Sequence, residues 1–68
     1  MNEYYFSGIR FIPGYNDTDW DDAHINAVNE IEAWKKLFQL TKRFTWRYVS
    51  LSKINGVDIE PQGVPENV

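Results

Sequence analysis

Four aspartates lie close together at Asp17, Asp19, Asp21 and Asp22, and the chain's single histidine, His24, follows them. Carboxylate oxygens are the ligands that Ca²⁺ and Mg²⁺ prefer in proteins. A calcium loop of the EF-hand type that starts at Asp17 needs glycine at its sixth position and glutamate at its twelfth, and neither residue stands there. We therefore expect no resident metal ion and no other cofactor.

The same acidic stretch fits two other roles. Thr18, Asp19 or Asp21 can each supply the oxygen that caps the start of a helix, and neighbouring carboxylates then favour the helix dipole. Alternatively, Asp17, Asp19, Asp21 and Asp22 form an acidic patch that contacts a basic protein surface, including a surface that normally holds nucleic acid. The pattern alone leaves both roles open.

Enzymatic activity is not expected. Acid–base or nucleophilic catalysis by His24 needs a nucleophile or a second proton-transfer group within hydrogen-bond reach. The chain has no cysteine, no serine in a nucleophile-elbow context and no glycine-rich phosphate loop. We interpret His24 as a surface residue beside acids.

Aromatic residues are the strongest signal in the chain, which has three Trp, four Tyr and four Phe among 68 residues. The segment from Phe44 to Leu51 reads as a strand with large side chains on both faces. One helix can cover only one face of a sheet. The pattern leaves open which face that is, and we expect the helix to cover the face with Val49 and Leu51. The opposite face then carries an exposed aromatic row, formed by Phe44, Trp46 and Tyr48.

The exposed row predicts a contact surface for a partner. We expect Tyr5, from the first strand, to extend the row, and Arg47 to contribute beside it. Trp, Tyr and Arg are the residues that most often dominate binding energy at protein interfaces. Together with the acidic stretch, these residues are the predicted partner-binding set.

The elements that position these residues begin with a strand over Tyr4–Ile12, closed by a turn at Pro13-Gly14. A β-bulge at Ser7-Gly8 and an ordinary two-sided strand are both compatible with its pattern. A polar loop over Tyr15–Asp22 leads into a helix. Apolar residues at three- and four-residue spacing from Ala27 to Thr41 mark one face of that helix, which ends at Lys42-Arg43.

A second strand is expected over Phe44–Ile54, followed by a two-residue type I′ turn at Asn55-Gly56. A third strand over Val57–Glu60 ends at Pro61. Residues 1–61 then make one domain, and residues 62–68 a disordered or extended tail.

The predicted fold is a single small α+β domain of order β-α-β-β, with one helix packed on a three-stranded sheet. The second strand is the longest and suits a central position, which makes it parallel to the first through a right-handed crossover. The alternative places the third strand in the middle of an all-antiparallel sheet.

Composition indicates which kind of partner the chain binds and where in the cell we expect it. Ten acidic residues against seven basic ones make nucleic acid an unlikely partner, because phosphate binding draws on concentrated Lys and Arg. No stretch approaches the roughly 20 apolar residues of a membrane span, and we expect a cytoplasmic protein.

A small acidic chain without catalytic residues is typical of a non-catalytic protein-binding module. Its size and character suggest an inhibitor from a phage or another mobile element that occupies a host nuclease or defence protein. One alternative is a small homodimeric accessory protein in an assembly. The other is a single-stranded nucleic-acid binder that stacks bases on the sheet aromatics.

Overall fold

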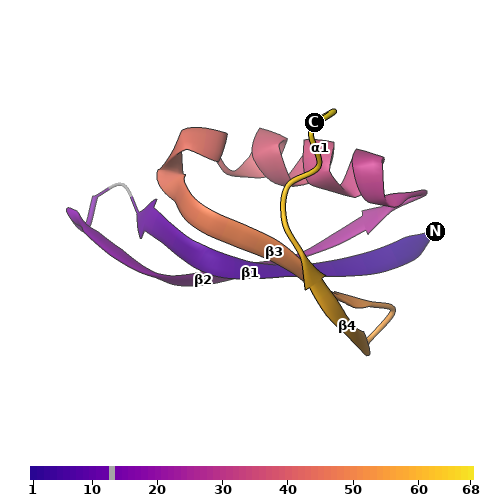
Figure 1. The fold of residues 1–68 in the computed structure, drawn as a ribbon. Coiled ribbons are helices and arrows are strands. Elements are labelled where there is room, and N and C mark those ends of the chain that lie inside the picture. The colour runs from indigo at the N-terminus through magenta and orange to yellow at the C-terminus, as the bar shows by residue number, and fades with distance from the viewer. Residues whose placement is uncertain (13) are drawn as a thin grey trace.

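The computed structural model describes residues 1–12 and 14–68, which form one α-helix packed on one face of an antiparallel sheet (Figure 1). The strands are β1 (Asn2–Ile12), β2 (Asp17–Ala27), β3 (Trp46–Ile54) and β4 (Val57–Gln62), and the helix is α1 (Glu30–Leu40). Their order across the sheet is β2-β1-β3-β4. The predicted α+β class, with one helix on a sheet, is confirmed.

The segment that we predicted to be a loop and the start of the helix forms strand β2 instead. Its eleven residues pair with β1 in continuous register, from Asn2 opposite Ala27 to Ile12 opposite Asp17, so the sheet has four strands instead of three. Aspartate has a low strand propensity, but β2 is an edge strand whose polar side chains reach water. Ala23, Ile25 and Ala27 then alternate toward the helix.

Helix α1 begins at Glu30 because Asn29 caps it. The Asn29 side chain accepts a hydrogen bond from the Glu32 backbone N–H at 2.9 Å. The predicted caps at Thr18, Asp19 and Asp21 are wrong, since all three residues lie in β2.

The buried face of α1 contains Trp34 and Leu37 of the predicted face, together with Ala33, whereas Ala27 lies in β2 and Val28 is exposed before the helix begins. Trp34 is fully buried, and its ring meets that of Phe6 edge-on at a centroid distance of 4.7 Å. Val49 and Leu51 of β3 belong to the same core, so the prediction that the helix covers their side of the sheet is confirmed. Burial of each large apolar side chain stabilises the fold by about 1.5–3 kcal/mol.

Strand β1 contains no bulge, because its pairing with β2 is continuous. Tyr4 and Phe6 face the helix, while Ile9 and Phe11 alternate to the other side of the sheet. The bulge interpretation of Ser7-Gly8 is therefore wrong. Glycine has a different function at position 8: a Cβ there would lie 2.1 Å from the Tyr48 carbonyl oxygen, so only glycine allows β3 to approach so closely.

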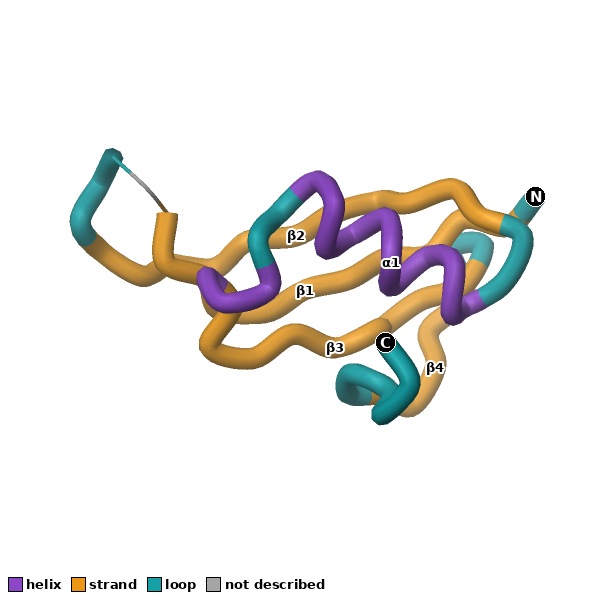
Figure 2. The backbone as a smooth tube through the Cα atoms, turned by 90° about the horizontal axis from the view of Figure 1, so that it is seen from above, coloured by secondary structure: helices purple, strands orange, loops and turns teal. Residues whose placement is uncertain are grey.

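The strand directions also differ from the expectation. Strand β3 lies between β1 and β4 as predicted, but it is antiparallel to β1. The long β1–β2 hairpin reverses the chain once more than the predicted order of elements does, and this reversal makes all neighbouring strands antiparallel. Figure 2 shows the hairpin extending beyond the end of the helix.

The predicted β3–β4 turn is confirmed. Asn55 and Gly56 both have positive φ, at 52° and 78°, and Ile54 pairs with Val57 across them. Strand β4 continues two residues further than predicted, through Pro61, which the outer edge of a sheet tolerates. The other predicted turn, at Pro13-Gly14, lies partly outside the described residues.

The C-terminal residues turn toward the helix side of the sheet (Figure 1). Val64 and Val68 pack against the core, and the Arg43 guanidinium donates to the Val68 carbonyl oxygen at 2.7 Å. The division of the chain into a domain and a tail at residue 61 stays a prediction. Within the described part of the chain, no helix has the length and apolar character needed to cross a membrane.

Candidate functional site

The open face is our name for the side of the sheet opposite α1, where no helix of residues 1–12 and 14–68 lies (Figure 1). Alternation along the strands and the pairing between them define the side chains on this face. They include Tyr5, Ser7, Ile9 and Phe11 of β1, Trp20, Asp22 and His24 of β2, and Tyr48 and Ser50 of β3.

Trp20 and Tyr48 form the apolar centre of the open face. Ile9 pairs with Trp20 on one side and with Tyr48 on the other, which places the three residues in one row across the sheet. The Trp20 and Tyr48 rings meet edge-on, 6.2 Å apart at 89°. Trp20 is 66% exposed and Tyr48 50% exposed, so most of this aromatic surface reaches solvent.

Trp46 is absent from this row, and its predicted place on the exposed face is wrong. It is only 9% exposed, and its indole N–H donates to the Thr41 hydroxyl at 2.9 Å. The cause is a β-bulge in β3. Trp46 pairs with Arg10 while Tyr48 pairs with Ile9, so the extra residue between Trp46 and Tyr48 turns their side chains to opposite faces.

The other predicted contact residues are dispersed. Phe44 is 86% exposed but lies in a 3-10 helix, η1 (Arg43–Thr45), outside the strands. Arg47 is the exposed extra residue of the bulge. Tyr5 lies on the open face, with its ring 4.8 Å from His24 and 5.8 Å from the Lys53 ammonium. Their roles in binding stay predictions.

Sequence reasoning missed Trp20 and Ile9 as members of the row. Trp20 stands among aspartates that read as a loop, and Ile9 was read only as part of an ambiguous strand. The usable signal was alternation: residues 17–27 place Ala23, Ile25 and Ala27 at every second position, which is a strand period.

The structure divides the expected acidic patch between two faces. Asp17, Asp19 and Asp21 point to the helix side of β2, and each carboxylate accepts a hydrogen bond from the next backbone N–H. Asp22 alone reaches the open face. Asp21 also forms a partly buried ion pair with Arg10, at 2.8 Å between Oδ2 and Nε.

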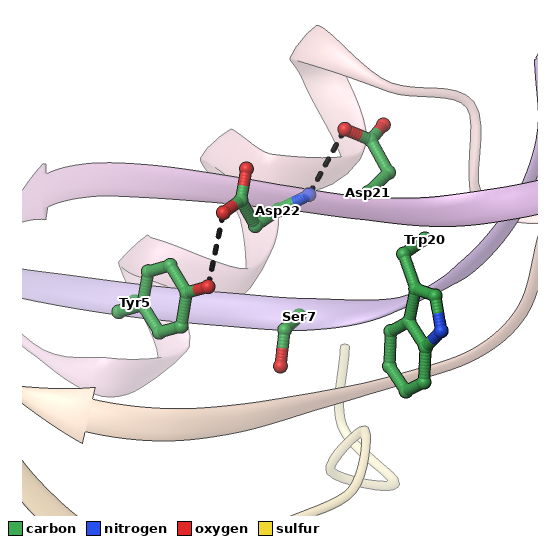
Figure 3. Close-up of a pocket in the computed structure, with 5 residues that line it drawn as sticks. All are labelled: Tyr5, Ser7, Trp20, Asp21 and Asp22. Carbon is green, nitrogen blue, oxygen red and sulfur yellow. Dashed lines mark hydrogen bonds between the residues drawn. The ribbon is translucent and has the colours of Figure 1, made fainter.

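A pocket of about 190 Å³ lies on the open face beside Trp20 (Figure 3). Tyr5, Ser7, Trp20, Asp21 and Asp22 line it. The Tyr5 hydroxyl donates to Asp22 Oδ2 at 2.9 Å. This hydrogen bond raises the pKa of Tyr5 above its usual value, and partial desolvation and the negative charge of Asp22 add to the effect.

The polar groups of the open face pair with neighbouring side chains. The Ser7 and Ser52 hydroxyls lie 3.3 Å apart, while His24 Nδ1 lies 3.6 Å from Glu3. The described residues hold no group of three His, Cys, Asp or Glu side chains placed to bind a metal ion. This arrangement supplies aromatic surface, hydroxyls and carboxylates for non-covalent contact. Comparisons with protein-family models, curated proteins and solved structures found no match for this chain.

Proposed function

We propose that this chain is a non-catalytic module that binds another protein through its open face. The observation that carries the proposal is the row of Trp20, Ile9 and Tyr48, whose two rings are half or more exposed. Tryptophan and tyrosine are enriched among the residues that dominate interface energies. A contiguous exposed apolar patch on a small domain is typical of an interaction site.

The rigidity of the row supports the same proposal. Ile9 lies on β1, which is hydrogen-bonded on one side to β2 and on the other to β3. The two rings already contact each other before any partner arrives. Binding therefore costs little conformational entropy, because the anchors do not need to be ordered.

The charges beside the row favour a protein over single-stranded nucleic acid. Base stacking on aromatics is effective when cationic groups follow the phosphates. On this face Lys53 lies 3.7 Å from Asp58 and His24 lies 3.6 Å from Glu3, so carboxylates already accompany both basic groups. Asp22 adds a further negative charge next to Trp20.

We extend the proposal to an inhibitory role in the cytoplasm, where the module covers the surface of a host nuclease or defence protein. The support is general. A chain of 68 residues with a net charge of −3 suits a module that covers a partner's surface and competes there with a negatively charged ligand. Such a mechanism needs no catalytic residue.

A selection experiment tests binding through the open face. Protein fragments from a display library are selected on the wild-type chain, and the enriched fragments are measured against variants. We expect Trp20→Ala to weaken their binding by about 2 kcal/mol, or roughly thirtyfold. Leu40→Ala is the control, because Leu40 is 74% exposed on the helix side. Equal effects of the two variants, or none, would contradict the proposal.

A further inference from the structure

The carboxylates near the open face differ in how their charge is neutralised. Asp58 lies 3.7 Å from Lys53, and on the other face Asp21 lies 2.8 Å from Arg10. Glu3 lies 3.6 Å from His24, which carries a charge only when it is protonated.

Asp22 differs from Asp21 and Asp58. Its side chain accepts from the neutral Tyr5 hydroxyl, and no cationic side chain of residues 1–12 and 14–68 forms an ion pair with it. Asp22 is therefore a negative charge on the open face without a counter-charge from the chain itself.

Aromatic rings flank this carboxylate. Figure 3 shows Tyr5 and Trp20 projecting from neighbouring strands with Ser7 between them, and Asp22 beside the Tyr5 hydroxyl. A cation above an aromatic ring is attracted by the ring's negative face, most strongly above tryptophan. A carboxylate beside exposed aromatic rings is complementary to a positively charged side chain.

We propose that this pocket receives the guanidinium group of an arginine on the partner protein. The inference rests on the proposed function and specifies the chemistry of its partner. A guanidinium is planar, so it stacks on the indole of Trp20 and donates in the same plane to Asp22 and to the Ser7 hydroxyl. An ammonium group is a compact and strongly hydrated charge that gains less from such a flat site.

Tyr5 acts in this site as a positioning residue. Its hydroxyl occupies Asp22 Oδ2 and holds the carboxylate on the open face, which leaves Oδ1 to accept from the guanidinium. Trp20 supplies the stacking surface.

The direct test is an NMR titration of the ¹⁵N-labelled chain with Nα-acetyl-arginine amide. Matched titrations use the lysine analogue and the citrulline analogue, which keeps the shape of arginine but carries no charge. We expect the arginine probe to shift the Trp20 indole and the Asp22 amide signals with a dissociation constant on the order of millimolar. The lysine probe should bind about threefold or more weakly, and citrulline should cause no shift at these positions.

Asp22→Asn tests the carboxylate and should weaken arginine binding about tenfold. Asp19→Asn is the matched control, since Asp19 lies on the opposite side of the same strand and should leave binding unchanged. Trp20→Ala removes the stacking surface and serves as a second variant if Asp22→Asn disturbs the fold. Unchanged arginine binding in Asp22→Asn, or equal binding of arginine and citrulline, would overturn the inference.

The two proposals fail in different ways. If selected partners require Trp20 and Tyr48 but tolerate Asp22→Asn, the open face is a binding face and the arginine assignment is wrong. If the arginine probe binds as expected while selected partners ignore Trp20 and Tyr48, the pocket stands and the proposed function is wrong.

Discussion

Trp46 and Trp20 lie on opposite faces of the same sheet, and they differ in burial and in their contacts. Trp46 is buried under the helix, donates a hydrogen bond to Thr41, and has the Arg10 guanidinium 5.8 Å from its ring. Trp20 exposes two-thirds of its surface and touches Tyr48 edge-on. The face of the sheet, rather than the residue type, therefore separates the core from a candidate contact surface.

Truncation of the two tryptophans should separate the faces most strongly. We expect Trp46→Ala to lower the free energy of unfolding by about 3–5 kcal/mol, because it leaves a cavity and removes the hydrogen bond from the indole to Thr41. That loss equals the whole stability typical of a core of this size. Trp20→Ala should cost less than about 1 kcal/mol. Urea unfolding followed by circular dichroism measures both, and similar losses would remove the distinction between the faces.

Gly8 lies where β1 leaves no room for a Cβ against the backbone of β3. We expect Gly8→Ala to cost about 2–3 kcal/mol, because the new Cβ must displace the backbone of β3 near Tyr48. Gly63→Ala is the control, since a Cβ at that position meets nothing within 4 Å. Thermal unfolding of the two variants checks the prediction. A Gly8→Ala protein as stable as the control would show that the strands are less tightly apposed.

Asp21 and Asp22 are neighbouring residues of one type that lie on opposite faces, because Asp21 points to the helix side and Asp22 to the open face. Asp21→Asn breaks the partly buried ion pair with Arg10 and should cost about 2 kcal/mol of stability. Asp22→Asn should cost less than about 0.5 kcal/mol, because an amide oxygen still accepts from the Tyr5 hydroxyl. Chemical denaturation measures both values. A larger loss for Asp22→Asn would assign a structural role to the open-face carboxylate.

The smallest expected effect is a pH dependence on the open face. The pKa of Tyr5 is raised in the folded state, so its contribution to stability is complete below the unfolded pKa of about 10 and is lost as pH rises through the folded value. The stability difference between the wild type and Tyr5→Phe should therefore shrink as the pH rises above about 10. Tyr15→Phe, at the exposed hairpin turn, is the control. A difference that grows with pH would contradict the assigned contact.

The sequence predicted the elements that strong local signals define. The apolar spacing around Trp34 and Leu37 identified the helix, and Asn55-Gly56 identified the β3–β4 hairpin. The pattern of β3 favoured the side of the sheet with Val49 and Leu51 as the one that the helix covers, but it left the opposite side open. These features depend on residues close together in the chain.

Features that depend on register were not predicted. Strand β2 is stabilised by its pairing with β1, which overrides the low strand propensity of its aspartates. Strict alternation placed Trp46 with Tyr48, but the bulge at Arg47 reverses that relation, and a single extra residue leaves no mark in the local pattern. The site shifted accordingly, from a row along one strand to a row across three.

The central claim is that the open face is free in solution for a different protein. Size-exclusion chromatography with light scattering, at about 10 µM, tests it most directly, since burial of the Trp20–Tyr48 row against a second copy would form a two-fold dimer. We predict the monomer mass of 8.0 kDa. A mass of twice that value, returning to the monomer in Trp20→Ala, would show that self-association uses the face and would contradict the account.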